Sequence, residues 1–174
     1  MVKVGKSQKQ SSLNPAQTES RKNKSPLTWL LLFVFLIAGL TAIGPAEKTL
    51  GINARVVYLH GVWVWAALAS FFAAAVFSLW GWIRKSIAAH IWSRAMGRTG
   101  LLLWITYLPV SMWAMQTNWN GLFLAEPRWR LAMIFAISGL LLQLGVTLLE
   151  NPAWASFANV LFIAILLIAL QNTE

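Results

Sequence analysis

The sequence predicts an all-α membrane protein, a polytopic bundle of about five transmembrane helices behind a basic N-terminal tail. The first observation is composition, because 58% of the 174 residues are hydrophobic and the mean hydropathy is +0.62. The second is that apolar runs long enough to cross a bilayer recur along the chain. The third is the net charge of +9, whose basic residues lie in the tail and beside the apolar runs. That distribution is typical of membrane topology, so we expect no nucleic-acid partner.

Two domains are predicted, a tail over residues 1–26 and a transmembrane helical domain over residues 27–174. Six basic residues in the tail are scattered among Ser, Gln and Asn. Such a composition cannot bury a hydrophobic core, which predicts a disordered tail on the cytoplasmic side. The long polar segment before the first apolar run argues against a cleavable signal peptide.

Turn and helix-breaking residues separate the apolar runs. The five predicted spans cover residues 27–43, 56–83, 100–115, 131–149 and 153–170. The second run is longer than a bilayer requires, so its first turns should project beyond the hydrocarbon. Asn151 and Pro152 predict an N-cap and first helical position for the last span.

Two connections have helical character of their own. Residues 86–95 are expected to form a surface helix between the second and third spans. Trp119, Phe123 and Glu126 fall at helical spacing, which predicts a short helix lying in the membrane interface and ended by Pro127.

Charge predicts the orientation. Of the fourteen basic residues, six lie in the tail and four in the connection over residues 84–98. The positive-inside rule therefore predicts a multi-pass protein of the inner (plasma) membrane with a cytoplasmic N-terminus and an outer C-terminus. With five spans, His60 and residues 119–128 fall on the same outer side.

Several chemistries lack their residues. The chain has no cysteine and no aspartate, which excludes disulfides, cysteine-ligated metals and most paired-carboxylate catalysis. A glycine-rich phosphate loop, an H-E-x-x-H motif and a nucleophile elbow are also absent from the sequence. We therefore expect no enzyme and no catalytic residues. No span carries an acid or base near its centre, which disfavours an ion-coupled transporter.

His60 is the best candidate for chemistry, because it lies where a loop enters a long apolar run. Its imidazole could ligate a metal or haem iron, carry a proton, or simply anchor the helix at the interface. Tryptophans gather on the same outer side, and a flat aromatic surface suits a planar apolar ligand, although belt residues look the same. These aromatic candidates are Trp63, Trp65, Trp119, Phe123 and Trp129. Arg55 and Arg128 could bind a ligand carboxylate, and an ion pair with Glu126 is the alternative for Arg128.

The stretch from Gly51 to Trp65 resembles the first-histidine region of the CcmC-type haem-handling proteins of cytochrome c assembly. That family has a G-x-x-x-R-x-x-Y-x-H pattern followed by tryptophan. The matching residues are Gly51, Arg55, Tyr58, His60 and Trp65. A second stretch, Trp119 to Arg128, keeps the first tryptophan, an acid and the arginine of the family's W-G-x-W-W-x-W-D-x-R loop. The resemblance covers roughly residues 27–149.

The resemblance implies a protein that holds haem at the outer membrane surface and presents it to a haem chaperone, beside other membrane subunits of cytochrome c maturation. His60 would be the axial iron ligand, with Trp119, Phe123 and Trp129 forming the haem platform. Arg55 and Arg128 would bind the propionates. The chain departs from the family pattern at Gly61-Val62, where the family has Val-Pro. It also lacks the second outer histidine and a sixth span, so it resembles a truncated or diverged member.

Two other functions fit the sequence. One is a non-haem membrane scaffold or accessory subunit on a degenerate cytochrome c assembly fold, which would use small residues to pack other membrane chains. These residues of the second span are Ala66, Ala67, Ala69, Ser70, Ala73, Ala74 and Ala75. The other is a component of a small-molecule permease, which the lack of intramembrane charge disfavours.

Overall fold

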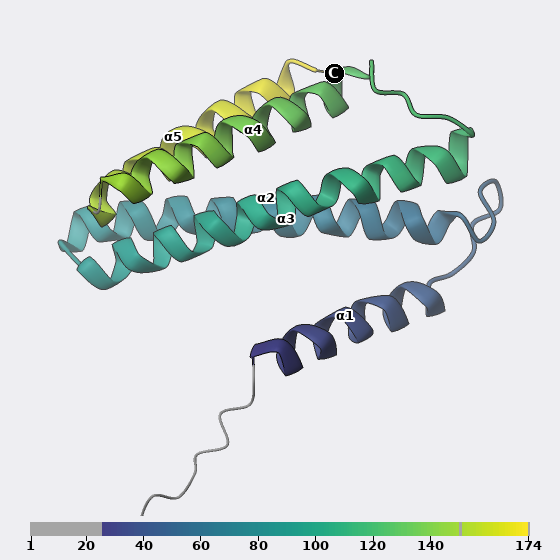
Figure 1. Ribbon diagram of the computed structural model, residues 1–174, viewed down its shortest axis with the longest axis horizontal. Helices are drawn as coiled ribbons and strands as arrows, with labels where there is room; N and C mark the ends of the chain where they lie inside the picture. The colour runs from purple at the N-terminus through teal and green to yellow at the C-terminus, as the bar shows by residue number, and fades with distance from the viewer. Residues whose placement is uncertain (1–25, 150, 174) are drawn as a thin grey trace, which may run out of the picture. The chain divides into compact units, whose positions relative to one another are not determined.

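The structure, a computed structural model, describes residues 26–149 and 151–173, and these residues form a helical protein (Figure 1). The helices are α1 (Pro26–Ile43), α2 (Ala54–Arg84), α3 (Ile87–Trp119), α4 (Pro127–Leu148) and α5 (Pro152–Gln171). Over the described ranges the only β-type pairing is an isolated bridge between Glu47 and Gly51. The all-α prediction is therefore confirmed, while most of the predicted tail falls outside the described residues.

Three helices, α2, α4 and α5, are long and apolar enough to cross a membrane by length and composition. The described part of α1 contributes a shorter apolar helix, Leu32–Ile43. The chain divides between residues 38 and 39 into two compact units, and the bundle of α2 to α5 belongs to the second unit. The structure thus supports a membrane protein with three candidate spans.

The two longest helices, α2 and α3, form an antiparallel hairpin (Figure 1). Lys85 ends α2 in the left-handed conformation, with φ 49°, and Ser86 caps α3 by accepting a hydrogen bond from Ala89 N. The predicted surface helix over residues 86–95 and the predicted third span are therefore one continuous helix, so their separation was wrong. The physical reason is that the polar residues at the start of α3, such as His90, are buried inside the bundle instead of facing water.

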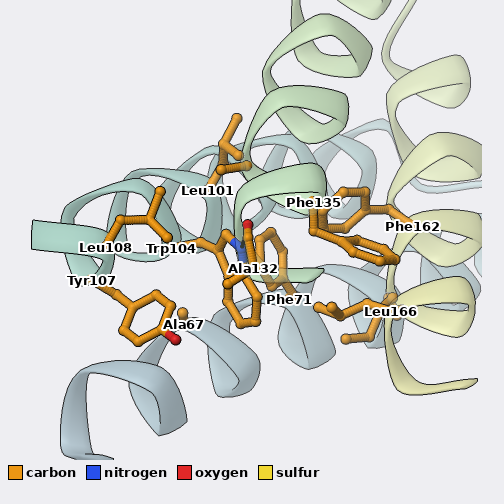
Figure 2. Packing of buried hydrophobic residues seen from close by; sticks show 13 residues of the cluster. Ala67, Phe71, Leu101, Trp104, Tyr107, Leu108, Ala132, Phe135, Phe162 and Leu166 are labelled. Atoms are coloured by element: carbon orange, nitrogen blue, oxygen red, sulfur yellow. Dashed lines mark hydrogen bonds between the residues drawn. The ribbon is translucent and has the colours of Figure 1, made fainter. Parts of the chain in front are cut away.

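Aromatic side chains from all four helices of the bundle make the core (Figure 2). Phe162 of α5 packs against Phe71 of α2 and Phe135 of α4, with ring centroids 5.0 and 5.5 Å apart. Trp104 of α3 is 2% exposed and its indole Nε1 donates a hydrogen bond to the Ala132 carbonyl at 3.0 Å. Large buried rings with a satisfied polar atom fix how α4 and α5 lie against the hairpin.

The segment between α3 and α4 differs from the prediction. Residues 120–126 form bends and turns, so the predicted interfacial helix does not form. Glu126 is instead the N-cap of α4, since its carboxylate accepts a hydrogen bond from Trp129 N at 2.6 Å, and Pro127 is the first helical residue. Proline is well suited to that position because its missing N–H would have no partner there. The same arrangement, Asn151 before Pro152, begins α5 as predicted.

Candidate functional site

The start of α2, the end of α3 and the start of α4 lie at one end of the bundle, which we call the His60 end (Figure 1). A hydrogen bond of 3.0 Å from Asn53 Nδ2 to the Thr117 carbonyl joins α2 to α3 there. The connection over residues 120–126 then leads from α3 into α4. Most of the predicted site residues belong to this end.

His60 is on α2, and its side chain faces α3. Its ring packs against Tyr107 of α3, with centroids 5.1 Å apart and planes tilted by 48°. The side chain is half-buried, and its Nδ1 atom is buried without a hydrogen-bond partner in the protein. An unsatisfied buried polar atom costs about 1–3 kcal/mol, and the ring would have to turn before this nitrogen could meet a ligand or a donor. The neighbouring Gly61 faces open space, because a side chain built there would meet nothing within 4 Å.

The two tryptophans that follow His60 point in different directions. Trp63 packs on the core cluster and donates from Nε1 to Thr106 Oγ1 of α3 at 2.9 Å. Trp65 is 73% exposed, and five residues turn a helix by about 140°, which places it well away from the His60 face. Trp63 therefore holds α2 against α3, whereas Trp65 lies apart from His60.

The aromatic residues predicted to form one platform differ in their exposure. The rings of Trp119 and Phe123 meet edge to face at 6.5 Å, and both side chains are more than half exposed. Trp129, in contrast, is buried in the first turn of α4, and its Nε1 atom has no hydrogen-bond partner. Asn118 Oδ1 is also buried and unpartnered. The His60 end thus combines an exposed aromatic pair with three unsatisfied buried polar atoms.

Both predicted arginines make contacts within the chain. Arg55 Nε donates to the Gly44 carbonyl at 2.9 Å, which ties the loop after α1 to the first turn of α2. Arg128 has an interaction partner within the chain as well. Either arginine would therefore have to share its donors with a ligand carboxylate.

The fit of a haem to these residues is partial. In the described part of the chain no group of three or more His, Cys, Asp or Glu side chains could hold a metal ion, and the other histidine, His90, is near the start of α3 at the opposite end of the bundle. A shallow crevice between the helices is lined by Phe71, Leu101, Gly139, Leu142, Gln143 and Phe162. It has essentially no room for even a water-sized molecule, far below the roughly 300–1,000 Å³ of typical ligand pockets, and it does not include His60. A planar ring would therefore lie on the open surface beside His60 and Gly61.

A second polar cluster, which was not predicted from the sequence, lies near the other end of the bundle. We call it the His90 network. His90 Nδ1 and Ser156 Oγ are 2.7 Å apart, and Ser78 Oγ and Ser93 Oγ are also 2.7 Å apart. Asn159 Nδ2 donates to the Ser93 carbonyl at 3.0 Å. These bonds join α2, α3 and α5.

The network continues into α4 and depends on two glycines. Gln143 Nε2 of α4 donates to Asn159 Oδ1 at 3.0 Å. A side chain on Gly81 would come within 2.7 Å of the His90 ring, and one on Gly97 within 2.8 Å of Asn159 Cγ. Small and polar residues three or four positions apart on apolar helices would have indicated this packing from the sequence.

Comparison with known proteins gave no match to a protein-family model, to a curated protein or to a solved structure.

Proposed function

We propose that this protein is a haem-handling integral membrane protein of the cytochrome c assembly type, holding haem at the outer membrane surface. The observation that supports it most is the unpartnered Nδ1 atom of His60, which becomes available to a ligand once the half-buried ring turns. In this proposal α1 and α3 cross the membrane together with α2, α4 and α5. The N-terminus is then cytoplasmic and the His60 end lies outside.

In this proposal, different residues of the His60 end bind different parts of the haem. His60 supplies one ring nitrogen to iron, since a neutral imidazole offers a lone pair. Trp119 and Phe123 offer apolar ring surface that covers a planar ligand and excludes water, because both side chains are exposed and in contact. The free N–H groups of Arg55 are suited to a propionate carboxylate.

An open surface with one protein ligand also favours release. His60 would hold the iron of a haem through one imidazole nitrogen, and a haem chaperone with its own ligand would compete with His60 for that iron. The chain would then act as a presenting surface rather than as an enzyme, with binding differences between partners driving transfer.

The test compares the two histidines of the chain. Protein purified in detergent and titrated with haemin should show a Soret band, and His60→Ala should abolish or shift it. His90→Asn is the matched control, because it alters the other histidine while keeping a polar atom next to Ser156, and its Soret band should equal that of the parent. Loss of the band in both variants would point to general unfolding, which circular dichroism would detect.

A colourless protein that takes up no haemin would contradict the proposal and favour the scaffold function. The structure adds one relevant fact, which is that much of the alanine-rich run already packs inside the chain. Ala67 and Ala74 are fully buried among the helices of the bundle, whereas Ala69 faces outward. A scaffold would therefore have fewer small residues free to pack a partner than the sequence suggests.

A further inference from the structure

Four cations lie near the end of the bundle opposite His60. Arg84 and Lys85 are at the α2–α3 turn, and Arg94 and Arg98 are one helical turn apart on α3. The described acidic residues, Glu47 and Glu126, both belong to the His60 end. Glu150 follows α4 in the sequence and lies outside the described residues. Among those that are described, this end therefore carries positive charge without a neighbouring carboxylate.

Arg94 and Arg98 are held differently from the turn cations. Arg98 donates to Thr147 Oγ1 in the last turn of α4 at 2.9 Å, which fixes its guanidinium between α3 and α4. Arg94 is half-buried, and its Nε atom is buried with no hydrogen-bond partner. Arg84, in contrast, is exposed and lies over the Trp80 ring at 5.1 Å. A buried guanidinium donor without an acceptor is costly, and a shift of the half-buried Arg94 side chain that brings this donor to an anion would remove that cost.

Apolar surface adjoins the two arginines. Leu102, one turn after Arg98, is 63% exposed, and Leu144 and Leu148 of α4 are 56% and 84% exposed. An anion that also carries long apolar chains would satisfy the guanidinium groups and cover these leucines at the same time. A free phosphate would satisfy only the charge.

We infer that Arg94 and Arg98 form a binding site for the headgroup phosphate of an anionic phospholipid, whose acyl chains lie along the exposed leucines of α3 and α4. The paired guanidinium groups bind the phosphate oxygens through charge-assisted hydrogen bonds. Arg84 and Lys85 contribute only diffuse attraction to a negatively charged lipid surface. The site is independent of His60 and of any haem.

The test is a titration of the full chain in detergent with phosphatidylglycerol, followed by native mass spectrometry of the lipid-bound protein. The double variant Arg94→Gln/Arg98→Gln should weaken binding by about tenfold or more, since charge-assisted hydrogen bonds are lost. The matched control Arg84→Gln/Lys85→Gln removes the same charge from the same end and should change the affinity by less than about twofold. Equal losses in the two double variants would overturn the site.

Two further measurements identify the ligand and test the site if the double variant does not fold. Phosphatidylcholine should bind more weakly than phosphatidylglycerol, and inorganic phosphate should not displace the bound lipid. Displacement by inorganic phosphate would show that the site takes the free anion and would overturn the lipid assignment. If the double variant fails to fold by circular dichroism, Arg94→Lys decides, because it keeps the charge but lacks the Nε donor. An unchanged affinity in Arg94→Lys would contradict the role of Arg94.

Discussion

The hydrogen bonding of buried polar side chains differs between the two ends of the bundle. In the His90 network every helix of the bundle contributes a side chain, and Asn159 is bonded to both Ser93 and Gln143. At the His60 end, three buried polar atoms have no partner, one each on His60, Asn118 and Trp129. The opposite end has two such atoms as well, Gln143 Oε1 and Arg94 Nε, but there a connected set of side-chain bonds joins all four helices. At the His60 end the bond from Asn53 to Thr117 joins only α2 and α3.

This difference separates a structural role from a binding role. Hydrogen bonds between helices in a membrane contribute about 0.6 kcal/mol each on average and also specify which faces pack. Unsatisfied groups contribute nothing to folding and are retained at a cost. The contrast predicts that substitutions in the His90 network lower stability, while substitutions of the open groups change binding.

The largest effect should come from Gly97→Ala. The new Cβ would lie 2.8 Å from Asn159 Cγ, so Asn159 must move and lose its bonds to Ser93. We expect a loss of about 1–3 kcal/mol of unfolding free energy, as for other overpacked sites. Gly145→Ala is the control, because nothing lies within 4 Å of that position and alanine favours the helix by up to about 1 kcal/mol. Thermal unfolding in detergent followed by circular dichroism would compare them, and equal midpoints would contradict the tight packing of the network.

An intermediate effect is expected from the indole N–H groups. Trp104→Phe removes a bonded donor from the core and should cost about 1–2 kcal/mol of stability. Trp129→Phe also removes buried ring volume but loses no hydrogen bond, so it should cost about 1 kcal/mol less than Trp104→Phe. Chemical or thermal unfolding of both variants measures the difference. A destabilisation by Trp129→Phe equal to that by Trp104→Phe would contradict the absence of a hydrogen-bond partner for Trp129 Nε1.

The smallest effect concerns the loop at the His60 end. The Glu47 carboxylate accepts hydrogen bonds from the Thr49 hydroxyl and from the backbone N–H groups of Thr49 and Leu50. These bonds, that of the Thr49 hydroxyl first, lower the pKa of Glu47 below its usual value. Because the pKa of Glu47 is lower in the folded loop than in the unfolded chain, its ionised carboxylate stabilises the folded loop at pH values above the unfolded-state pKa. This stabilisation is lost as the pH falls through the pKa of the folded state.

Thr49→Val should therefore raise the pKa of Glu47 toward its usual value, and Thr49→Ser should leave it low because the hydroxyl remains. A carbon-13 NMR titration of the Glu47 carboxyl group measures both. An unchanged pKa in Thr49→Val would mean that the hydroxyl bond does not hold the carboxylate.

Most of the helices were predictable because their ends are marked by residues with a clear physical role. Asn151 and Pro152 begin α5, and the charged pair Arg84 and Lys85 ends the apolar run of α2. The start of α3 was not predictable from polarity, since His90 and the arginines there resemble a solvated connection. Pro127 was misjudged because proline both ends helices and begins them, and only the capping bond from Glu126 distinguishes the two.

The candidate site was predictable only in part. Sequence spacing placed His60 and Trp119 at the same end, and the Asn53–Thr117 bond agrees with that placement. Sequence spacing could not show that Trp65 and His60 point in different directions, because the face of α2 that packs on α3 is known only from the structure. The His90 network was missed because its bonds cross between residues 66 positions apart, and no local pattern reports such a distance.

The hairpin is much longer than the helices that pack on it. α2 and α3 have 31 and 33 residues, whereas α4 and α5 have 22 and 20. At 1.5 Å per residue the hairpin extends to nearly 50 Å, while the shorter pair matches a hydrocarbon layer of about 30 Å. Because the His90 network ties the hairpin to the start of α5, the surplus length falls at the opposite tip. A hydrocarbon layer that covers α4 and α5 would therefore leave this tip outside it, where a water-soluble protein could bind the tip without entering the lipid.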